Sequence, residues 1–234
     1  MMYKRVLIKL SGEGIAGDTA KLFDDATLKK IASVIKRLSN QGIELSIVIG
    51  AGNIWRGSRQ CGLDIDRVRG DHMGMLATLI NSIALQDYLI KSGLDTVVMS
   101  AVQMSQFCET YSQSKALEHM KNKKAVIIAC GVGYPFFTTD TGMMLRAAEL
   151  NVDVVLSAKA IDGVYDKDPH IYPDAVKYEK VSYDDIINKR LNVIDQTASA
   201  FGRDNNIKIL LFALSDPENI YRAAMGENIG TIVT

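Results

Sequence analysis

The sequence predicts an α/β protein whose mainly parallel sheet is covered by helices on both faces. Short runs rich in β-branched residues alternate several times with longer segments whose apolar residues recur at helical spacing. This alternation implies right-handed βαβ connections, which place helices on both sides of one sheet. Glycines and charged residues follow several strands, at the edge where parallel sheets bind their ligands.

The predicted elements follow one another along the chain without an internal repeat. A first strand spans residues 3–10, and a helix with apolar positions at 28, 31, 32, 35 and 38 ends near Gly42. A second helix covers about residues 71–90, and its predicted apolar face consists of Leu76, Leu79, Ile80, Ile83 and Ala84. The other predicted strands are residues 45–49, 96–99, 125–129, 152–156 and 207–212.

Composition restricts the class of protein. The 234 residues are 47% hydrophobic, and 27 basic residues balance 27 acidic ones, which argues against a broadly basic nucleic-acid-binding protein. No apolar run approaches the roughly 18 residues of a membrane span, and the N-terminal apolar stretch is too short for a signal peptide. Cys61, Cys108 and Cys130 form no C-x-x-C pair, so we expect reduced thiols in a cytoplasmic protein, with neither a disulfide framework nor a zinc site.

A glycine-rich segment follows the first strand and begins at Lys9, Leu10 and Ser11. Residues Gly12 to Gly17 match G-x-G-x-x-G, but residues 18–21 predict a loop where a dinucleotide site opens a helix, and no acid ends the second strand. Gly-Lys is absent, which excludes a Walker P-loop. Two interpretations remain about equal: a turn that cradles phosphate beside a lysine, or an ordinary tight turn.

A second glycine-rich turn, residues 50–53, ends the second strand, and Arg56 follows it. An arginine there could bind phosphate oxygens through two parallel hydrogen bonds. For this motif alone a glycine turn with a solvated arginine is favoured, but the repetition of such turns at the ends of two early strands shifts the balance toward a phosphate site. Asp71 is either the N-cap of the second helix or a carboxylate that binds ribose hydroxyls.

Two further loops carry candidate residues. In residues 131–142, Phe136 and Phe137 could fill the core, Thr138 or Asp140 could cap the next helix, or Asp140 could orient a lysine. Residues 157–169 contain Asp-Gly and Asp-Pro turns, or else a nucleotide cradle with Tyr165 against a base. The turn-rich stretch 162–173 is interpreted as a connection between two lobes of one domain, 1–234.

Five motifs occur in one order: residues 9–12, the turn 50–53 with Arg56-Gly57, residues 70–75, residues 135–140 and residues 161–165. Together they resemble bacterial uridylate kinases of the amino acid kinase superfamily, over essentially the whole chain. The resemblance implies a three-layer αβα sandwich, usually a homohexamer built from dimers, that acts in pyrimidine nucleotide biosynthesis. The implied reaction transfers the γ-phosphoryl group of ATP to UMP, and magnesium is carried by the ATP phosphates with no direct protein ligand.

The resemblance also implies two lobes and a role for each matched residue. The lobe of about residues 1–158 would bind UMP and the lobe of about 159–234 would bind ATP. Catalysis would involve Lys9 at the transferring oxygens, Arg56 at the phosphates and Asp140 orienting Lys9. The implied ATP-binding residues are Lys9, Leu10, Ser11, Gly12, Gly52, Arg56, Lys159, Tyr165 and Asp168. The implied UMP-binding residues are Ala51, Asp71, Val132, Gly133, Tyr134, Pro135, Phe136, Phe137, Thr138 and Thr139.

Some positions depart from the family pattern. Tyr134 and Val132 stand where asparagine and threonine are common, so the uracil contacts are expected to differ in detail. Gln86 and Ile90 stand at positions matched to an arginine and a histidine of the GTP-responsive members, which predicts no GTP activation. Feedback inhibition by UTP is expected. Three alternatives stay open: a nicotinamide oxidoreductase, a metal-oxyanion storage protein on the same scaffold, and a kinase of an amino acid or carbamate.

Overall fold

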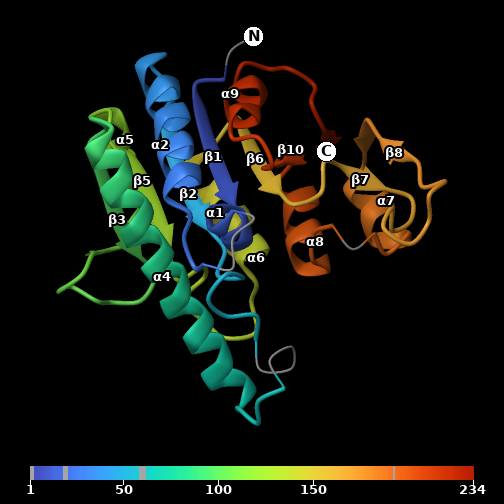
Figure 1. The fold of residues 1–234 in the computed structure, drawn as a ribbon, viewed down its shortest axis with the longest axis horizontal. Coiled ribbons are helices and arrows are strands. Elements are labelled where there is room, and N and C mark those ends of the chain that lie inside the picture. Colours follow the sequence, from blue (N-terminus) through green and yellow to red (C-terminus); the bar gives the residue numbers. More distant parts are fainter. Residues whose placement is uncertain (1–2, 18–20, 58–61, 192) are drawn as a thin grey trace.

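The computed structural model describes residues 3–17, 21–57, 62–191 and 193–234 (Figure 1). Cys61 and residues 18–20 of the predicted loop therefore lie outside the described residues. The strands are β1 (Arg5–Leu10), β2 (Glu44–Ile49), β3 (Thr96–Ser100), β4 (Glu109–Thr110), β5 (Ala125–Ala129), β6 (Val154–Lys159), β7 (Val164–Tyr165), β8 (Lys177–Tyr178), β9 (Lys180–Val181), β10 (Ile209–Ala213) and β11 (Thr231–Val233). The helices are α1 (Gly12–Ala16), α2 (Asp25–Asn40), α4 (Arg67–Lys91), α5 (Gln113–Lys121), α6 (Thr139–Leu150), α7 (Tyr183–Asn188), α8 (Gln196–Asp204) and α9 (Glu218–Ala224).

Within the described residues, nine strands form one sheet in the order β4-β3-β5-β2-β1-β6-β10-β11-β9. Every neighbouring pair is parallel except β10 and β11, so the predicted mainly parallel sheet is confirmed. In the centre, Leu10 of β1 lies in register with Ile49 of β2 and Ala158 of β6. The ends of these three strands therefore lie together at one edge. The segment after β6 forms a separate antiparallel pair, β7 and β8, within the stretch interpreted as a connection.

Alternation along the buried strands divides the core into two layers. Val6, Ile8 and Leu10 of β1 pack in a cluster with apolar residues of α2, α4 and α9. Leu7 packs in the other cluster, with residues of α5, α6, α7 and α8. Because successive side chains of a strand point to opposite faces, helices cover both sides of the sheet (Figure 1). The three-layer αβα architecture is confirmed.

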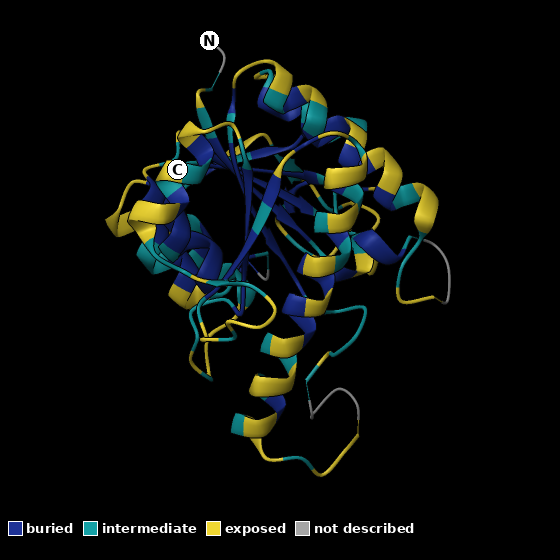
Figure 2. Ribbon diagram, turned by 90° about the vertical axis from the view of Figure 1, so that its left-hand side faces the viewer, coloured by how far each residue is buried: buried dark blue, intermediate teal, exposed yellow. Residues whose placement is uncertain are grey.

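The second long helix differs from its prediction in which face is buried. Leu79 is buried, but Leu76, Ile80 and Ile83 are 51%, 50% and 40% exposed, and exposed residues recur along α4 in Figure 2. The face against the sheet carries buried polar residues, among them Thr78 and Asn81. The predicted apolar face was therefore largely wrong, because periodicity alone does not tell which of two apolar stripes meets the sheet.

The start of α4 was also predicted too late. The carboxylate of Asp66 accepts hydrogen bonds from the backbone N–H groups of Val68 and Arg69, so Asp66 is the N-cap. Asp71 lies inside the helix, and its interpretation as a cap is wrong. This helix is long and apolar enough to cross a membrane by length and composition, contrary to the sequence expectation, but its buried face packs on β2, β3 and β5 within the domain.

The structure bears on three local predictions. The first predicted helix corresponds to α2, which ends at Asn40, and Gly42 follows with φ +80°, as its predicted position at the end of the helix requires. After β1, the short helix α1 opens inside the glycine pattern, where the Ser11 hydroxyl accepts a hydrogen bond from Gly14 N at 3.0 Å. The loop predicted for residues 18–21 follows this helix, and its one described residue, Lys21, lies in neither a helix nor a strand. Cys108 and Cys130 are free thiols, as predicted.

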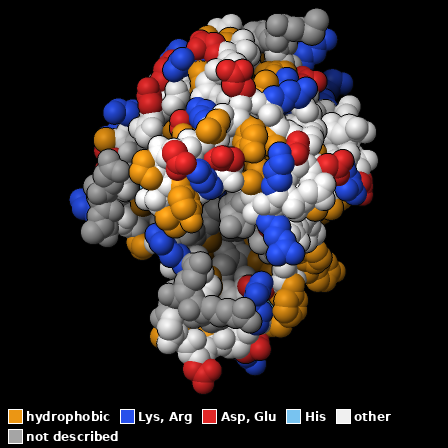
Figure 3. Space-filling view, turned by 90° about the vertical axis from the view of Figure 1, so that its right-hand side faces the viewer, with side chains coloured by type: hydrophobic (Ala, Val, Ile, Leu, Met, Phe, Trp, Pro, Cys, Tyr) orange, Lys and Arg blue, Asp and Glu red, His pale blue; other side chains and the backbone are white. Residues whose placement is uncertain are grey.

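The surface carries mixed charges. On the face seen in Figure 3, Lys and Arg side chains are interspersed with Asp and Glu side chains. Among the residues described on that face, no broad basic surface is present, which agrees with the balanced composition.

Candidate functional site

Two lysines lie on the same face of the sheet, at the ends of neighbouring strands. Lys9 is next to last in β1, and its side chain points to the side of Leu7, toward α6. Lys159 is the last residue of β6. It lies on the same face of the sheet as Val155 of that strand, because alternate residues of a strand point to the same side. Since β1 and β6 are parallel and in register, strand geometry alone brings the two ammonium groups to one place.

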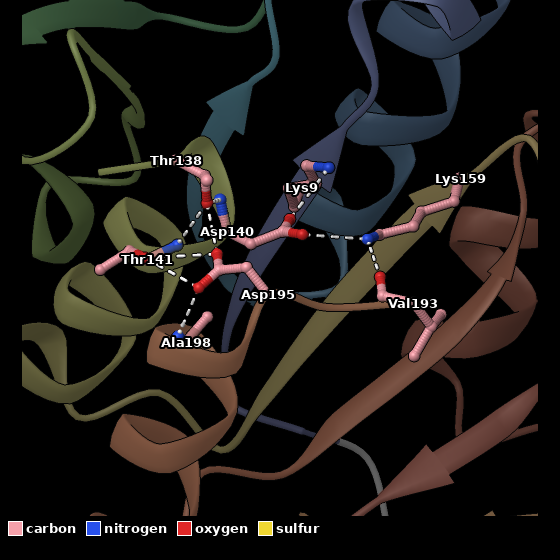
Figure 4. Close-up of polar contacts among 8 residues, drawn as sticks. All are labelled: Lys9, Thr138, Asp140, Thr141, Lys159, Val193, Asp195 and Ala198. Carbon is pink, nitrogen blue, oxygen red and sulfur yellow. Dashed lines mark hydrogen bonds and ion pairs between the residues drawn. The ribbon is translucent and has the colours of Figure 1, made fainter. Parts of the chain in front are cut away.

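Asp140, in the first turn of α6, lies between these lysines (Figure 4). Its Oδ1 is 3.2 Å from Lys9 Nζ and its Oδ2 is 3.1 Å from Lys159 Nζ. Lys159 Nζ also donates a hydrogen bond to the backbone carbonyl of Val193. All three charged side chains are at most 16% exposed, so solvent screens their interactions only weakly. The predicted contact between Asp140 and Lys9 is therefore present, and Lys159 joins it.

Burial and charge oppose each other in this cluster. Burial would raise the pKa of Asp140, but the positive charges of Lys9 and Lys159 outweigh it and lower that pKa from 3.8 to about 2. Burial is the main cause that lowers the pKa of Lys159, an effect that the Asp140 carboxylate partly offsets. The carboxylate is thus charged at neutral pH, and Lys159 gives up its proton more readily than an ordinary lysine.

A second carboxylate, that of Asp195, binds residues at the start of α6, next to Asp140, and was missed by the sequence analysis. It is the N-cap of α8 and accepts a hydrogen bond from Ala198 N at 2.9 Å. Thr138, the N-cap of α6, donates its hydroxyl hydrogen to Asp195 at 2.5 Å, and Thr141 does so at 3.3 Å (Figure 4). The starts of α6 and α8 are thereby joined through their caps. The only available signal was an aspartate before a helix, which is common for N-caps.

The two glycine-rich turns touch each other. A Cβ on Gly12 would lie 2.7 Å from the Gly50 carbonyl oxygen and 2.7 Å from the Gly52 nitrogen, so only glycine fits there. The buried Asn81 of α4 donates to the Gly50 carbonyl at 2.7 Å and exchanges hydrogen bonds with Asn53. The polar buried face of α4 therefore fixes the second turn against the first.

Arg56 extends from the second turn over the first. Its Nη2 is 2.9 Å from the Glu13 carboxylate, and its Nε donates to the Gly52 carbonyl at 3.2 Å. The side chain is 59% exposed, so this ion pair contributes at most about 1 kcal/mol and is readily exchanged for a ligand oxygen.

Arg56 and Gly52 line two cavities at once. The Asp71 cavity, of about 530 Å³, lies beyond β2 and β5 and is lined by Ala51, Gly52, Trp55, Arg56, Gly57, Arg67, Gly70, Asp71, Gly74, Met75, Thr78, Cys130, Gly131, Val132, Tyr134, Phe137, Thr138 and Thr139. The Ser11 cavity, of about 750 Å³, is lined by Ser11, Glu13, Gly14, Ala16, Gly17, Lys21, Leu22, Thr27, Lys30, Gly52, Asn53, Arg56, Lys159, Ala160, Leu214, Ser215 and Pro217. The two cavities share Gly52 and Arg56. The lysine cluster adjoins both, because Asp140 follows Thr139 of the first cavity and contacts Lys159 of the second, although Lys9 and Asp140 themselves line neither.

Asp71 lies in its cavity with its carboxylate already engaged. Arg67 Nε donates to both carboxylate oxygens, at 2.8 and 3.0 Å, and Phe136 N donates to Oδ2 at 2.8 Å. A ribose hydroxyl at this carboxylate would have to compete with an arginine one helical turn away.

The loop of residues 132–139, predicted to bind UMP, lines the Asp71 cavity only in part. Val132, Tyr134, Phe137, Thr138 and Thr139 line it, whereas Gly133, Pro135 and Phe136 do not. Phe136 and Phe137 are 63% and 49% exposed, which rules out the interpretation that they fill the core. Thr138 caps α6, as one of the sequence alternatives proposed.

The predicted ATP-binding residues lie in three places besides the lysine cluster. Leu10 and Gly12 are buried inside the protein. Ser11, Gly52, Arg56 and Lys159 line the Ser11 cavity. Tyr165 and Asp168 line a third cavity of about 310 Å³, the Tyr165 cavity, which also includes Lys167, Lys189, Arg190 and Val193. Val193 accepts the hydrogen bond of Lys159, so the Tyr165 cavity adjoins the lysine cluster.

Acidic and sulfur-containing residues are dispersed at this edge. In the described part of the chain, no group of three or more His, Cys, Asp or Glu side chains could hold a metal ion by itself. The buried Oδ1 of Asp140 makes no hydrogen bond to the described residues and is paired with the Lys9 ammonium group at 3.2 Å.

The chain is similar to known proteins over nearly its whole length. Residues 4–213 match the model of the amino acid kinase family. Two solved structures, the UMP kinases of Bacillus anthracis and Ureaplasma parvum, are 39% and 36% identical with TM-scores of 0.94 and 0.93. Both alignments cover 100% of this chain, and they cover 97% and 100% of the respective relatives.

A third structure shows how widely the fold is shared. The uridylate kinase of Archaeoglobus fulgidus is 24% identical, with a TM-score of 0.75, and both chains are covered completely. At that identity the likeness concerns the fold alone. From the family match and the two closer structures, this chain belongs to the amino acid kinase family.

Proposed function

We propose that the protein is a UMP kinase, a nucleoside monophosphate kinase that converts ATP and UMP into ADP and UDP. One observation carries the proposal: a buried Lys9–Asp140–Lys159 cluster adjoins two cavities that share Gly52 and Arg56, in a chain 39% and 36% identical to two UMP kinases. A phosphoryl transfer needs two anionic substrates brought together at a cationic centre, and this arrangement supplies both requirements.

The Asp71 cavity is assigned to UMP. Asp71 would accept hydrogen bonds from the ribose hydroxyls, and residues 132–139 would surround uracil and the phosphate. The Ser11 cavity is assigned to the ATP phosphates, because Lys21, Lys30, Arg56 and Lys159 are among the residues that line it. The Tyr165 cavity would take the adenosine end. The adenosine end would then lie in the proposed ATP lobe of about residues 159–234, whereas the ATP phosphates would lie in a cavity lined mostly by residues of the proposed UMP lobe, about 1–158.

The residues of the cluster then act on charge and position. The attacking phosphate of UMP is already an anion, so the reaction needs no general base. Lys9 and Lys159 would stabilise negative charge on the transferring oxygens, with Arg56 assisting once it leaves Glu13. Asp140 would keep the two ammonium groups apart and oriented, at 3.2 and 3.1 Å from its oxygens.

Magnesium is expected to enter with ATP and, when bound, would neutralise negative charge on the ATP phosphates. Asp140 would help to hold it indirectly, because its buried Oδ1, paired with Lys9 at 3.2 Å, accepts no hydrogen bond from the described residues. The protein itself would contribute orientation, with the charge of Asp140 maintained by the lysines.

We further propose that the protein is a homohexamer built from dimers in the cytoplasm, and that UTP inhibits it. The support for association is the exposed stripe of α4, defined as Met73, Leu76, Ile80, Ile83 and Ile90. These residues recur every three, four or seven positions and lie along one side of the helix, as in helices that pair with a second helix. A second copy of the chain is the proposed partner.

The test is ADP release from magnesium-ATP in the presence of UMP, CMP, dCMP, AMP, GMP, acetylglutamate, aspartate or carbamate. Turnover with UMP alone is the expected result. Turnover with another acceptor and none with UMP would keep the family and overturn the proposed substrate. No turnover with any acceptor would favour a binding protein without kinase activity.

A further inference from the structure

A buried arginine lies behind the proposed UMP cavity and has no part in the mechanism above. Arg146, in α6, is 5% exposed. Its Nη1 donates to the Glu149 carboxylate at 2.7 Å, and its Nη2 donates to the backbone carbonyl of Gly131 at 3.1 Å. The guanidinium also stacks on Tyr111, 4.1 Å from the ring centroid. Since burying a charge is costly, such a residue usually has a specific partner to hold.

The partner here is the turn that follows β5 and lines the Asp71 cavity. Cys130 and Gly131 both have positive φ, +64° and +55°, a conformation that a residue with a Cβ rarely adopts. Such a turn keeps its shape only where neighbours enforce it. Three neighbours do so: Thr78 accepts from Cys130 N at 2.9 Å, Gly142 packs under Gly131, and Arg146 binds its carbonyl.

Arg146 is itself held rigidly from the opposite side. Glu149 accepts both the Arg146 hydrogen bond and the Tyr111 hydroxyl, the latter at 2.8 Å. The guanidinium therefore has a fixed plane, set by the ring and the carboxylate, and its Nη2 points at Gly131, while its buried Nε has no hydrogen-bond partner among the described residues. A lysine would keep the charge but could not make two diverging hydrogen bonds and a stack at once.

We propose that Arg146 is a positioning residue for the acceptor nucleotide, a role that rests on the proposed function. By fixing the Gly131 carbonyl, it sets the path of the loop that carries Val132, Tyr134 and Thr138 into the Asp71 cavity. It touches neither the lysine cluster nor the residues that line the Ser11 cavity by any hydrogen bond or ion pair described for it. Its loss should therefore weaken UMP binding and leave ATP binding unchanged.

The test compares Arg146→Met and Arg146→Lys with the wild type. Trp55 is the sole tryptophan and lines the Asp71 cavity, so its fluorescence follows nucleotide binding without any need for turnover. UMP titrations and steady-state kinetics are measured in parallel. Arg146→Met should raise the Kd and KM for UMP at least tenfold, change KM for ATP less than twofold, and change kcat less than threefold. Arg146→Lys should fall between it and the wild type.

Arg203→Met is the matched control, because Arg203 forms its ion pairs on the surface, with Asp184 and Asp204. It should leave both Michaelis constants unchanged. A folded Arg146→Met protein with the wild-type affinity for UMP, or with equal losses for UMP and ATP, would overturn the inference.

If Arg146→Met does not fold, Glu149→Gln releases one side of the guanidinium and should raise the Kd for UMP two- to fivefold. An unchanged Kd in that variant would also overturn the inference. A wild-type protein that neither binds nor phosphorylates UMP would instead refute the proposed function. The same variants would then be titrated with the acceptor that the ADP-release panel identifies, and an unchanged affinity for it would overturn the role of Arg146.

Discussion

Replacing Asp140 with asparagine tests whether the carboxylate between the two lysines maintains their charge. The substitution keeps the size of the side chain and removes the negative charge that lies 3.2 Å from Lys9 and 3.1 Å from Lys159. Because that charge raises the pKa of Lys159 against the effect of burial, its removal lowers the pKa of Lys159 further. Lys159 should then lose its proton, and turnover should fall, at a lower pH than in the wild type.

The size of the effect follows from the pKa of Asp140. Burial raises it and the lysines lower it, with a net fall from 3.8 to about 2, which corresponds to roughly 2 kcal/mol of folding stability. Because the folded-state pKa is the lower one, this stability is present above pH 3.8 and is lost as the pH falls toward 2. In Asp140→Asn, the alkaline limb of kcat should move down by about one pH unit or more, as is typical when an adjacent opposite charge is removed.

The assay is kcat from pH 6 to 10 at saturating magnesium-ATP and UMP, with unfolding free energies measured between pH 2 and 7. Asp184→Asn is the matched control, since Asp184 pairs with Arg203 on the surface and is 65% exposed. Its pH–rate profile should coincide with that of the wild type. Coincidence of the Asp140→Asn profile with the wild type, in a protein that still turns over, would refute the reasoning.

Three further outcomes follow from the same structure. Lys9→Ala should lower kcat about a thousandfold and change the KM for UMP only a few-fold, as steady-state kinetics would show; equal losses in both would contradict a transition-state role. Asp71→Asn should raise the KM for UMP about tenfold with little change for ATP, and an unaffected KM would remove Asp71 from the ribose site. Ile80→Glu places a charge in the exposed stripe of α4 and should dissociate the oligomer, as sedimentation velocity would show. Lys29→Glu, which changes an exposed side chain of α2, should leave the oligomer intact.

Most of the fold could be predicted because its central strands are buried on both faces. Such strands are continuous apolar runs, and the predicted strand 125–129 coincides with β5. The face of α4 could not be predicted in this way. Its exposed stripe is as apolar as its buried one. The buried stripe contains Asn81 and Thr78 because these residues bind backbone groups of the turns after β2 and β5, respectively. That preference arises from tertiary contacts that periodicity does not contain.

The candidate site shows the same division. Residues at strand ends, such as Lys9 and Ser11, were predicted because a parallel sheet collects its strand ends at one edge. Lys159 was predicted among the ATP-binding residues, and strand alternation places it beside Asp140, a contact that the sequence analysis did not predict. Asp195 could not be predicted, since it lies 57 positions after Thr138 in the sequence and only the packing of α8 against α6 brings them together.

Because α4 has two functional faces, the affinity for UMP should depend on the protein concentration. One face holds the turns that shape the acceptor cavity through Thr78 and Asn81, and the other presents the stripe proposed to bind a second copy. If association of two copies orders this helix, it would also favour nucleotide binding, and nucleotide binding would favour association by the same free energy. Apparent UMP affinity should rise with the concentration of the protein itself, and UMP should in turn hold the copies together. Measured at nanomolar enzyme, the Michaelis constant would then describe a different species from the one that works in a crowded cell.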